Sequence, residues 1–141
     1  MSDIIKPSGQ FNNKSKYILG VDLNRGGADE SAFVVIEQLP FSADNTGLFV
    51  SYIETYNTTN LAETIGRLQY LHSLFNFRKI IVDTTGLGAG VTDVLKERIP
   101  GGIVEEFIFT GKSKPELFYN LKILMQQGKL KIPDYSKTGL E

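Results

Sequence analysis

Two aspartates, Asp22 and Asp83, each end a short run of apolar residues that is typical of a buried strand. A glycine-bearing loop follows each of them directly. Placing a carboxylate at the end of a core strand costs free energy unless the carboxylate holds a metal ion or a hydrogen-bond partner. These two residues are therefore the first candidates for chemistry.

Each aspartate also has a purely structural explanation. Asp22 can cap the turn that follows it through its own backbone, as aspartates in short loops often do. Asp83 can cap the N-terminus of the following helix, or accept amide hydrogens from the loop over residues 86–90. Taken singly, neither aspartate decides between capping and chemistry.

Their joint placement favours chemistry. In a meander followed by a crossover, the first and fourth strands can lie side by side, which would bring both carboxylates to the same edge of the sheet. Two adjacent carboxylates repel each other unless a cation lies between them. Hard oxygen ligands suit Mg²⁺ or Mn²⁺, and a two-metal site is a recurring device for phosphodiester cleavage.

The strands that would position these aspartates follow from the apolar pattern. Runs over 17–22, 32–37 and 48–54, separated by short glycine-containing turns, predict three strands in an antiparallel meander. The nearly all-apolar run over 79–83 predicts a strand buried on both faces of a sheet. A fifth strand is expected over 104–109.

The helices follow from a change of period. After a possible N-cap at Asn60, leucine and isoleucine recur every three or four residues to position 74, which predicts an amphipathic helix. A second helix is expected over about 91–98. A third should open at Pro115 and stop at Gly128, with one face lined by Leu117, Leu121, Leu124 and Met125. The whole predicts an α/β fold in which helices flank a mixed sheet.

Composition bounds the class of protein. With 141 residues, 41% hydrophobic residues and a formal net charge of −1, the chain fits one compact domain. The absence of cysteine excludes a disulfide framework. No apolar run approaches the roughly 20 residues that span a bilayer. We expect a linker or frayed terminus over 1–16, and the domain over 17–141.

The acidic strand ends belong to a longer series of motifs. The series comprises GVD at 20–22, GGAD at 26–29, IVDTTGLGAG at 81–90, TGKSKP at 110–115 and GKLKIP at 128–133. In order and separation these motifs resemble the nuclease domain of tailed-phage terminase large subunits, and the resemblance covers nearly all of the chain from Tyr17 onward.

The resemblance implies an RNase H-like fold and a divalent-metal-dependent endonuclease that cuts concatemeric viral DNA during genome packaging. Asp22 matches the family's acidic ligand on the first strand, and Asp83 matches the ligand on the fourth. The implied cofactor is Mg²⁺ or Mn²⁺, and the implied substrate is double-stranded DNA. The implied partners are an upstream ATPase domain, the portal protein and the small terminase subunit, in the cytoplasm of a bacterial host that carries the phage or prophage.

The sequence also departs from the family pattern. The third acidic ligand of the family lies on a helix beyond the segment that ends here at Pro133, and no residue of this chain can be assigned to it. We therefore expect a nuclease domain truncated at its C-terminal end, whose own activity can be weak or missing. Asp29 can orient the first loop, although turn formation is the simpler explanation. Lys112 and Lys114 can meet DNA phosphates, or can be solvated loop lysines.

Two other functions stay open at this point. Sugar kinases and actin-like ATPases also begin with a strand that ends in Asp and runs into a glycine-rich turn, which the stretch over 22–27 could supply. The other alternative is an interaction module without catalysis, in which both aspartates are caps.

Overall fold

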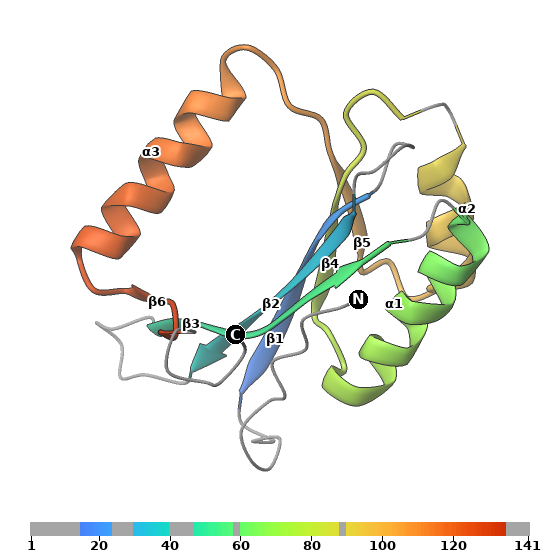
Figure 1. Ribbon diagram of the computed structural model, residues 1–141, viewed down its shortest axis with the longest axis horizontal. Coiled ribbons are helices and arrows are strands. Elements are labelled where there is room, and N and C mark those ends of the chain that lie inside the picture. The colour runs from blue at the N-terminus through green and yellow to red at the C-terminus, as the bar shows by residue number, and fades with distance from the viewer. Residues whose placement is uncertain (1–14, 24–29, 40–46, 58–59, 88–89, 135–141) are drawn as a thin grey trace.

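The computed structural model describes residues 15–23, 30–39, 47–57, 60–87 and 90–134. Within these residues the chain forms one six-stranded sheet and three helices (Figure 1). In chain order the elements are β1 (Lys16–Asp22), β2 (Ser31–Leu39), β3 (Gly47–Tyr56), α1 (Leu61–Phe75), β4 (Lys79–Asp83), α2 (Val91–Arg98), β5 (Val104–Phe107), α3 (Ser113–Gln126) and β6 (Leu130–Lys131).

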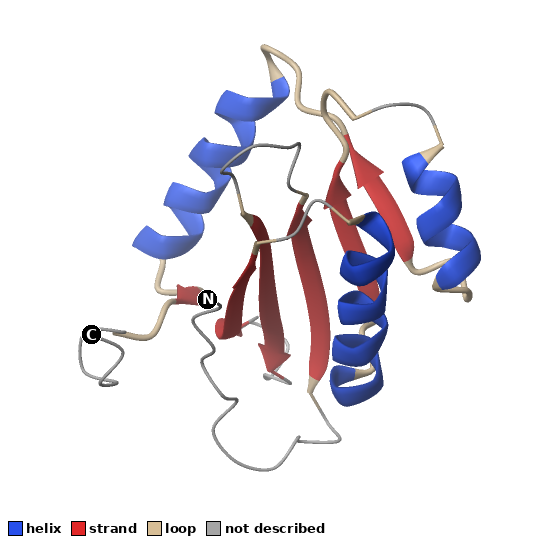
Figure 2. Cartoon of the chain, turned by 45° about the vertical axis from the view of Figure 1, so that its right-hand side comes forward, coloured by secondary structure: helices blue, strands red, loops and turns tan. Residues whose placement is uncertain are grey.

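The strands lie in the order β5-β4-β1-β2-β3-β6. β1, β2 and β3 form the predicted antiparallel meander, whereas β4 runs parallel to β1 and β5 runs parallel to β4. β6 adds a short parallel pair to β3 at the other edge. Figure 2 shows this mixed sheet with helices beside it, which confirms the predicted α/β class.

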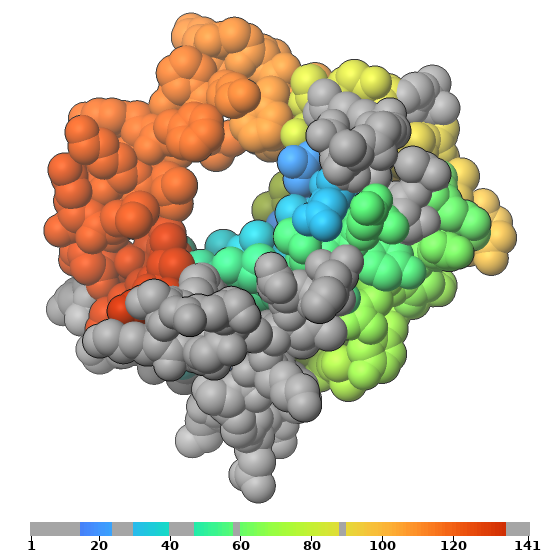
Figure 3. All heavy atoms as spheres, viewed as in Figure 1, coloured from blue at the N-terminus to red at the C-terminus, as the bar shows by residue number. Residues whose placement is uncertain are grey.

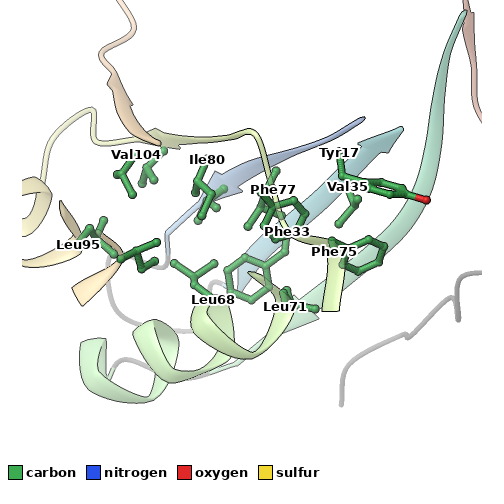
Figure 4. Close-up of a cluster of buried hydrophobic side chains, with 14 of the residues drawn as sticks. Tyr17, Phe33, Val35, Leu68, Leu71, Phe75, Phe77, Ile80, Leu95 and Val104 are labelled. Atoms are coloured by element: carbon green, nitrogen blue, oxygen red, sulfur yellow. The ribbon is translucent and has the colours of Figure 1, made fainter. Parts of the chain in front are cut away.

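One face of the sheet carries the hydrophobic core. Alternate side chains of the central strands, such as Phe33, Val35 and Ile80, have no exposed surface and pack toward α1 (Figure 4). From α1, Leu68 and Leu71 meet them, at the spacing that puts residues on one helix face. The core is therefore formed where every second side chain of the strands packs against one face of α1, whose residues recur with a period of about 3.6.

Local signals explain the ends of α1. At its start the side chain of Asn60 accepts hydrogen bonds from the N–H groups of Ala62 and Glu63, as the predicted N-cap requires. At its end Asn76 adopts a left-handed conformation with φ 52°, and the Phe77 N–H donates to His72 Nδ1 at 3.1 Å. These contacts fix where β4 begins and therefore where Asp83 lies.

The third helix differs from the prediction. α3 begins at Ser113 rather than Pro115, because Ser113 and Thr110 exchange hydrogen bonds that build its first turn. None of its residues is buried, so its apolar positions do not form a packed face. Figure 3 shows an opening between α3 and the sheet, on the side away from α1.

Smaller differences concern strand ends. β5 stops at Phe107 rather than 109, because the Phe109 N–H bonds to Thr85 Oγ1 instead of continuing the ladder. β6 was not predicted. β1 begins at Lys16, one residue before the predicted domain start, and the predicted linker lies almost wholly outside the described residues. Within the part of the chain that the structure describes, no helix is long and apolar enough to cross a membrane.

Candidate active site

The two aspartates lie side by side. β1 and β4 are parallel neighbours, and Asp22 and Asp83 are register partners at the last position of each strand. Each directly follows a buried valine, Val21 or Val82. Because side chains alternate along a strand, both carboxylates lie on the face away from α1. The predicted adjacency of the first and fourth strands is therefore present.

The loop after β4 holds one of the carboxylates. Asp83 Oδ1 accepts a hydrogen bond from the Thr85 N–H at 2.9 Å, a turn-capping contact one residue before the loop over 86–90 that the structural explanation of Asp83 named. Thr85 Oγ1 in turn accepts the Phe109 N–H at 2.7 Å. An ionised carboxylate has about four lone-pair sites on two oxygens, and this bond uses one of them.

A cavity of about 610 Å³ opens over the two aspartates. It is lined by Asp22, Leu23, Glu30, Asp83, Thr85, Phe109, Lys114 and Phe118. Three of these residues follow β5 or lie on α3, so the cavity lies between the sheet and α3. The Lys114 ammonium lies 5.7 Å from the centre of the Phe109 ring, within the range of a cation–π contact.

Of the remaining predicted site residues, only one lies at the cavity within the described part of the chain. Lys114 lines the cavity, whereas Lys112 occupies the N-cap of α3 and is not among the described lining residues. Asp29 and the turn over residues 24–29 lie outside the described residues. The phosphate loop required by the kinase-like alternative would fall in the same turn.

Glu30 is a lining residue that the sequence analysis missed. The signal was available, because Ala32 pairs with Asp22 and side chains two residues apart on a strand share a face. Glu30 is exposed, immediately before β2, and adds a third negative charge to the cavity. Its charge favours cations in this space.

The donor set fits a hard divalent cation in type. Asp22 and Asp83 offer carboxylate oxygens, the ligands that Mg²⁺ and Mn²⁺ prefer, and they come from two rigid strands rather than from loops. Within the described residues, no three acidic, histidine or cysteine side chains gather closely enough to hold a metal ion. Two carboxylates are thus a fitting but partial ligand set.

A second charged cluster lies on the opposite, α1-facing side of the sheet. Glu54 of β3 is 1% exposed, and its carboxylate accepts bonds from Arg67 Nε of α1 at 2.7 and 2.9 Å. Burial, and then the charge of Glu54, raises the pKa of Tyr52 above its usual 10.0. Burial lowers the pKa of Arg67, but hydrogen bonds and charge from Glu54 and Tyr52 outweigh it and raise that pKa overall. This cluster does not reach the cavity and fastens α1 to β3.

The fold is that of RNase H-like α/β proteins, with a meander joined to parallel strands. Within that class, the chain is structurally similar to nuclease domains of phage large terminases. The large terminase nuclease from thermophilic phage G20c with bound magnesium matches with a TM-score of 0.72 at 24% identity, over 92% of this chain and 64% of that chain. The zinc-bound form of that nuclease gives a TM-score of 0.69 at 24% identity, over 92% and 70%. The Thermus phage P74-26 large terminase nuclease domain gives 0.64 at 23% identity, over 89% and 60%.

These likenesses confirm the fold that the motifs implied. No protein-family model and no curated protein matches the sequence. The chain spans 64% of the magnesium-bound G20c nuclease, which is less than two thirds of that chain.

Proposed function

We propose that this chain is a divalent-metal-dependent DNA endonuclease domain of a phage terminase large subunit, which cuts concatemeric DNA during genome packaging. The observation that carries the proposal is the register pairing of Asp22 with Asp83 at the floor of one cavity. The comparison structures support it, because large terminase nucleases of this fold were solved with bound magnesium, zinc and cobalt.

The residues present divide the work between metal and substrate. Asp22 and Asp83 would hold Mg²⁺ or Mn²⁺, and Glu30 adds negative charge beside them. A bound divalent ion supplies charge stabilisation to a phosphodiester and a more acidic water. Thr85 orients the Asp83 carboxylate through its N–H. Lys114 lines the same cavity and would contact a substrate phosphate. Lys112, at the N-cap of α3, would contact the DNA backbone further along.

The wider setting is part of the same proposal. The substrate is double-stranded DNA, and the complete protein carries an upstream ATPase domain and works with a portal protein and a small terminase subunit in the host cytoplasm. A third acidic ligand is supplied by residues other than those described. The alternative, in which both aspartates are only caps, predicts stability effects without any metal effect.

Metal binding tests the proposal directly. We expect Mn²⁺ to raise the melting temperature of the protein, and Asp22→Asn or Asp83→Asn to abolish that increase, because each substitution removes one of two ligands. Glu97→Gln is the matched control, since Glu97 is an exposed acid on α2 outside the cavity. Nicking of supercoiled plasmid in the presence of Mn²⁺ should likewise be lost in Asp22→Asn and Asp83→Asn and retained in Glu97→Gln. Unchanged Mn²⁺ binding in both aspartate variants would refute the proposal.

A further inference from the structure

The face of α3 that borders the cavity combines cations with an exposed aromatic ring. Lys114 and Phe118 both line the cavity and are four residues apart, so they are neighbours on the helix surface. Lys122 follows at the same interval, which places the three side chains about 6 Å apart along the helix axis. We call these three residues the α3 stripe.

Phe118 is a largely exposed aromatic residue of α3. Its side chain is 61% exposed although it lines a cavity, and no residue of α3 is buried. A fully covered phenylalanine would gain about 1.5–3 kcal/mol of hydrophobic free energy relative to an exposed one. The ring therefore offers a flat apolar surface to the cavity that the two aspartates also line.

The charge around α3 identifies the kind of partner. Residues 110–132 carry five lysines and one acid, Glu116, in a chain whose net charge is −1. Lys114 brings this basic segment to the cavity that the acidic pair also lines, so the α3 side attracts a polyanion while the aspartates attract a cation. A nucleic-acid strand complements both charges, because its phosphates attract the lysines and a metal ion bound to one phosphate attracts the carboxylates.

The aromatic ring narrows the form of that nucleic acid. An intact duplex presents phosphates and sugars outward and keeps the faces of its bases stacked inside. A phenylalanine can stack readily on a base that has left the duplex, and such stacking is how proteins bind single strands. Cations at one-turn spacing on either side of the ring suit the phosphates that flank such a base.

We propose that Phe118 stacks on an unpaired base next to the scissile phosphate, the one that lies at the metal site of Asp22 and Asp83. Lys114 and Lys122 would contact the phosphates on either side of that base. The site would then bind DNA that is locally unpaired more tightly than intact duplex. This inference rests on the proposed nuclease function, which supplies the position of the scissile phosphate.

Binding of three labelled DNAs tests the inference, with Ca²⁺ present and fluorescence anisotropy as the readout. The probes are a single strand, the matching blunt duplex, and the same duplex with a mismatched centre. We expect Phe118→Ala to weaken binding of the single strand and the mismatched duplex by about 5- to 150-fold, and of the blunt duplex by less than about twofold. Phe118→Trp should restore binding.

Two other variants make the result specific. Tyr119→Ala is the matched control, because Tyr119 is 65% exposed on the same helix but lies about 100° around it and does not line the cavity. It should leave all three affinities unchanged. Lys114→Gln should weaken binding of all three DNAs and lower the slope of log affinity against log salt concentration by about one. Melting temperatures should match the wild type, since both aromatic residues are exposed.

Several outcomes would overturn the inference. It is overturned if Phe118→Ala leaves single-strand binding unchanged, if Phe118→Ala weakens binding of all three DNAs equally, or if the wild type binds none of them. A change in sedimentation upon Phe118→Ala would show that a second copy of the chain covers the ring instead. Mn²⁺ binding by the Asp22 and Asp83 variants does not depend on Phe118. A failure of this inference is therefore distinguishable from a failure of the nuclease proposal.

Discussion

Replacing Arg67 by methionine should destabilise the protein strongly. The guanidinium gives two hydrogen bonds to a carboxylate, Glu54, that is 1% exposed. Methionine retains most of the apolar stem but leaves Glu54 buried without its counter-charge. Breaking such a pair from one side costs about 3–5 kcal/mol, and a Coulomb attraction of about 4 kcal/mol at an effective dielectric constant near 20 is of the same size.

At about 2–4 °C per kcal/mol for a domain of this size, the melting temperature should fall by roughly 6–20 °C. Urea unfolding followed by circular dichroism measures the same loss as a lower midpoint with an unchanged slope. Arg78→Met is the control, because Arg78 is exposed, and surface changes of this kind usually stay within about 0.5 kcal/mol.

The double variant Glu54→Gln with Arg67→Met separates charge from packing. It removes both charges and keeps an oxygen that can accept from the Tyr52 hydroxyl, which lies 3.3 Å from Glu54 Oε2. We expect it to recover more than half of the stability lost in the single variant. The reasoning is refuted if Arg67→Met costs less than about 1 kcal/mol, or if the double variant is no more stable than the single one.

Three further predictions concern single contacts. The raised pKa of Tyr52 means that the folded state favours the neutral phenol, so its stabilising contribution is complete below about pH 10 and is lost as pH rises through the folded pKa; melting at pH 8 to 11.5 should show a shallower alkaline decline in Tyr52→Phe, and equal slopes would contradict this. Thr85→Val removes the acceptor of the Phe109 N–H and should cost about 1–3 kcal/mol in urea unfolding, whereas an unchanged midpoint would show that the bond is dispensable. Asn60→Ala removes the cap of α1 and should cost about 0.5–2 kcal/mol, with Asn60→Asp as the variant that retains stability.

The sheet that holds the aspartates could be predicted because its signals are local. Apolar runs and glycine-bearing turns located β1 to β4, and the bounds of β4 and α2 were predicted to the residue. The prediction that β4 is buried on both faces was wrong, because Ile81 is exposed on the face away from the core. A meander followed by a crossover also indicated that Asp22 and Asp83 would meet, which the register bears out. These features depend on the period of side chains and on chain connectivity, and both can be read from sequence.

Features that depend on distant contacts could not be predicted in this way. β6 is two residues long, and its pairing with β3 is set by how α3 returns to the sheet. The apolar pattern of α3 indicated a helix but did not reveal that no partner within the described residues covers it. Phe118 carried no signal of its own, because only the path of α3 brings it to the cavity.

The absence of buried side chains in α3 lowers the free energy needed to unfold this helix locally. A helix of 14 residues without a buried side chain is near the length at which isolated helices are marginal in water. Its local unfolding free energy should therefore lie well below that of β1 and β4, whose amides lie in the centre of the sheet. Hydrogen exchange should detect α3 opening while the rest of the sheet stays closed. A DNA strand bound to α3 would slow that exchange. Binding of the DNA and ordering of this helix would then be a single event.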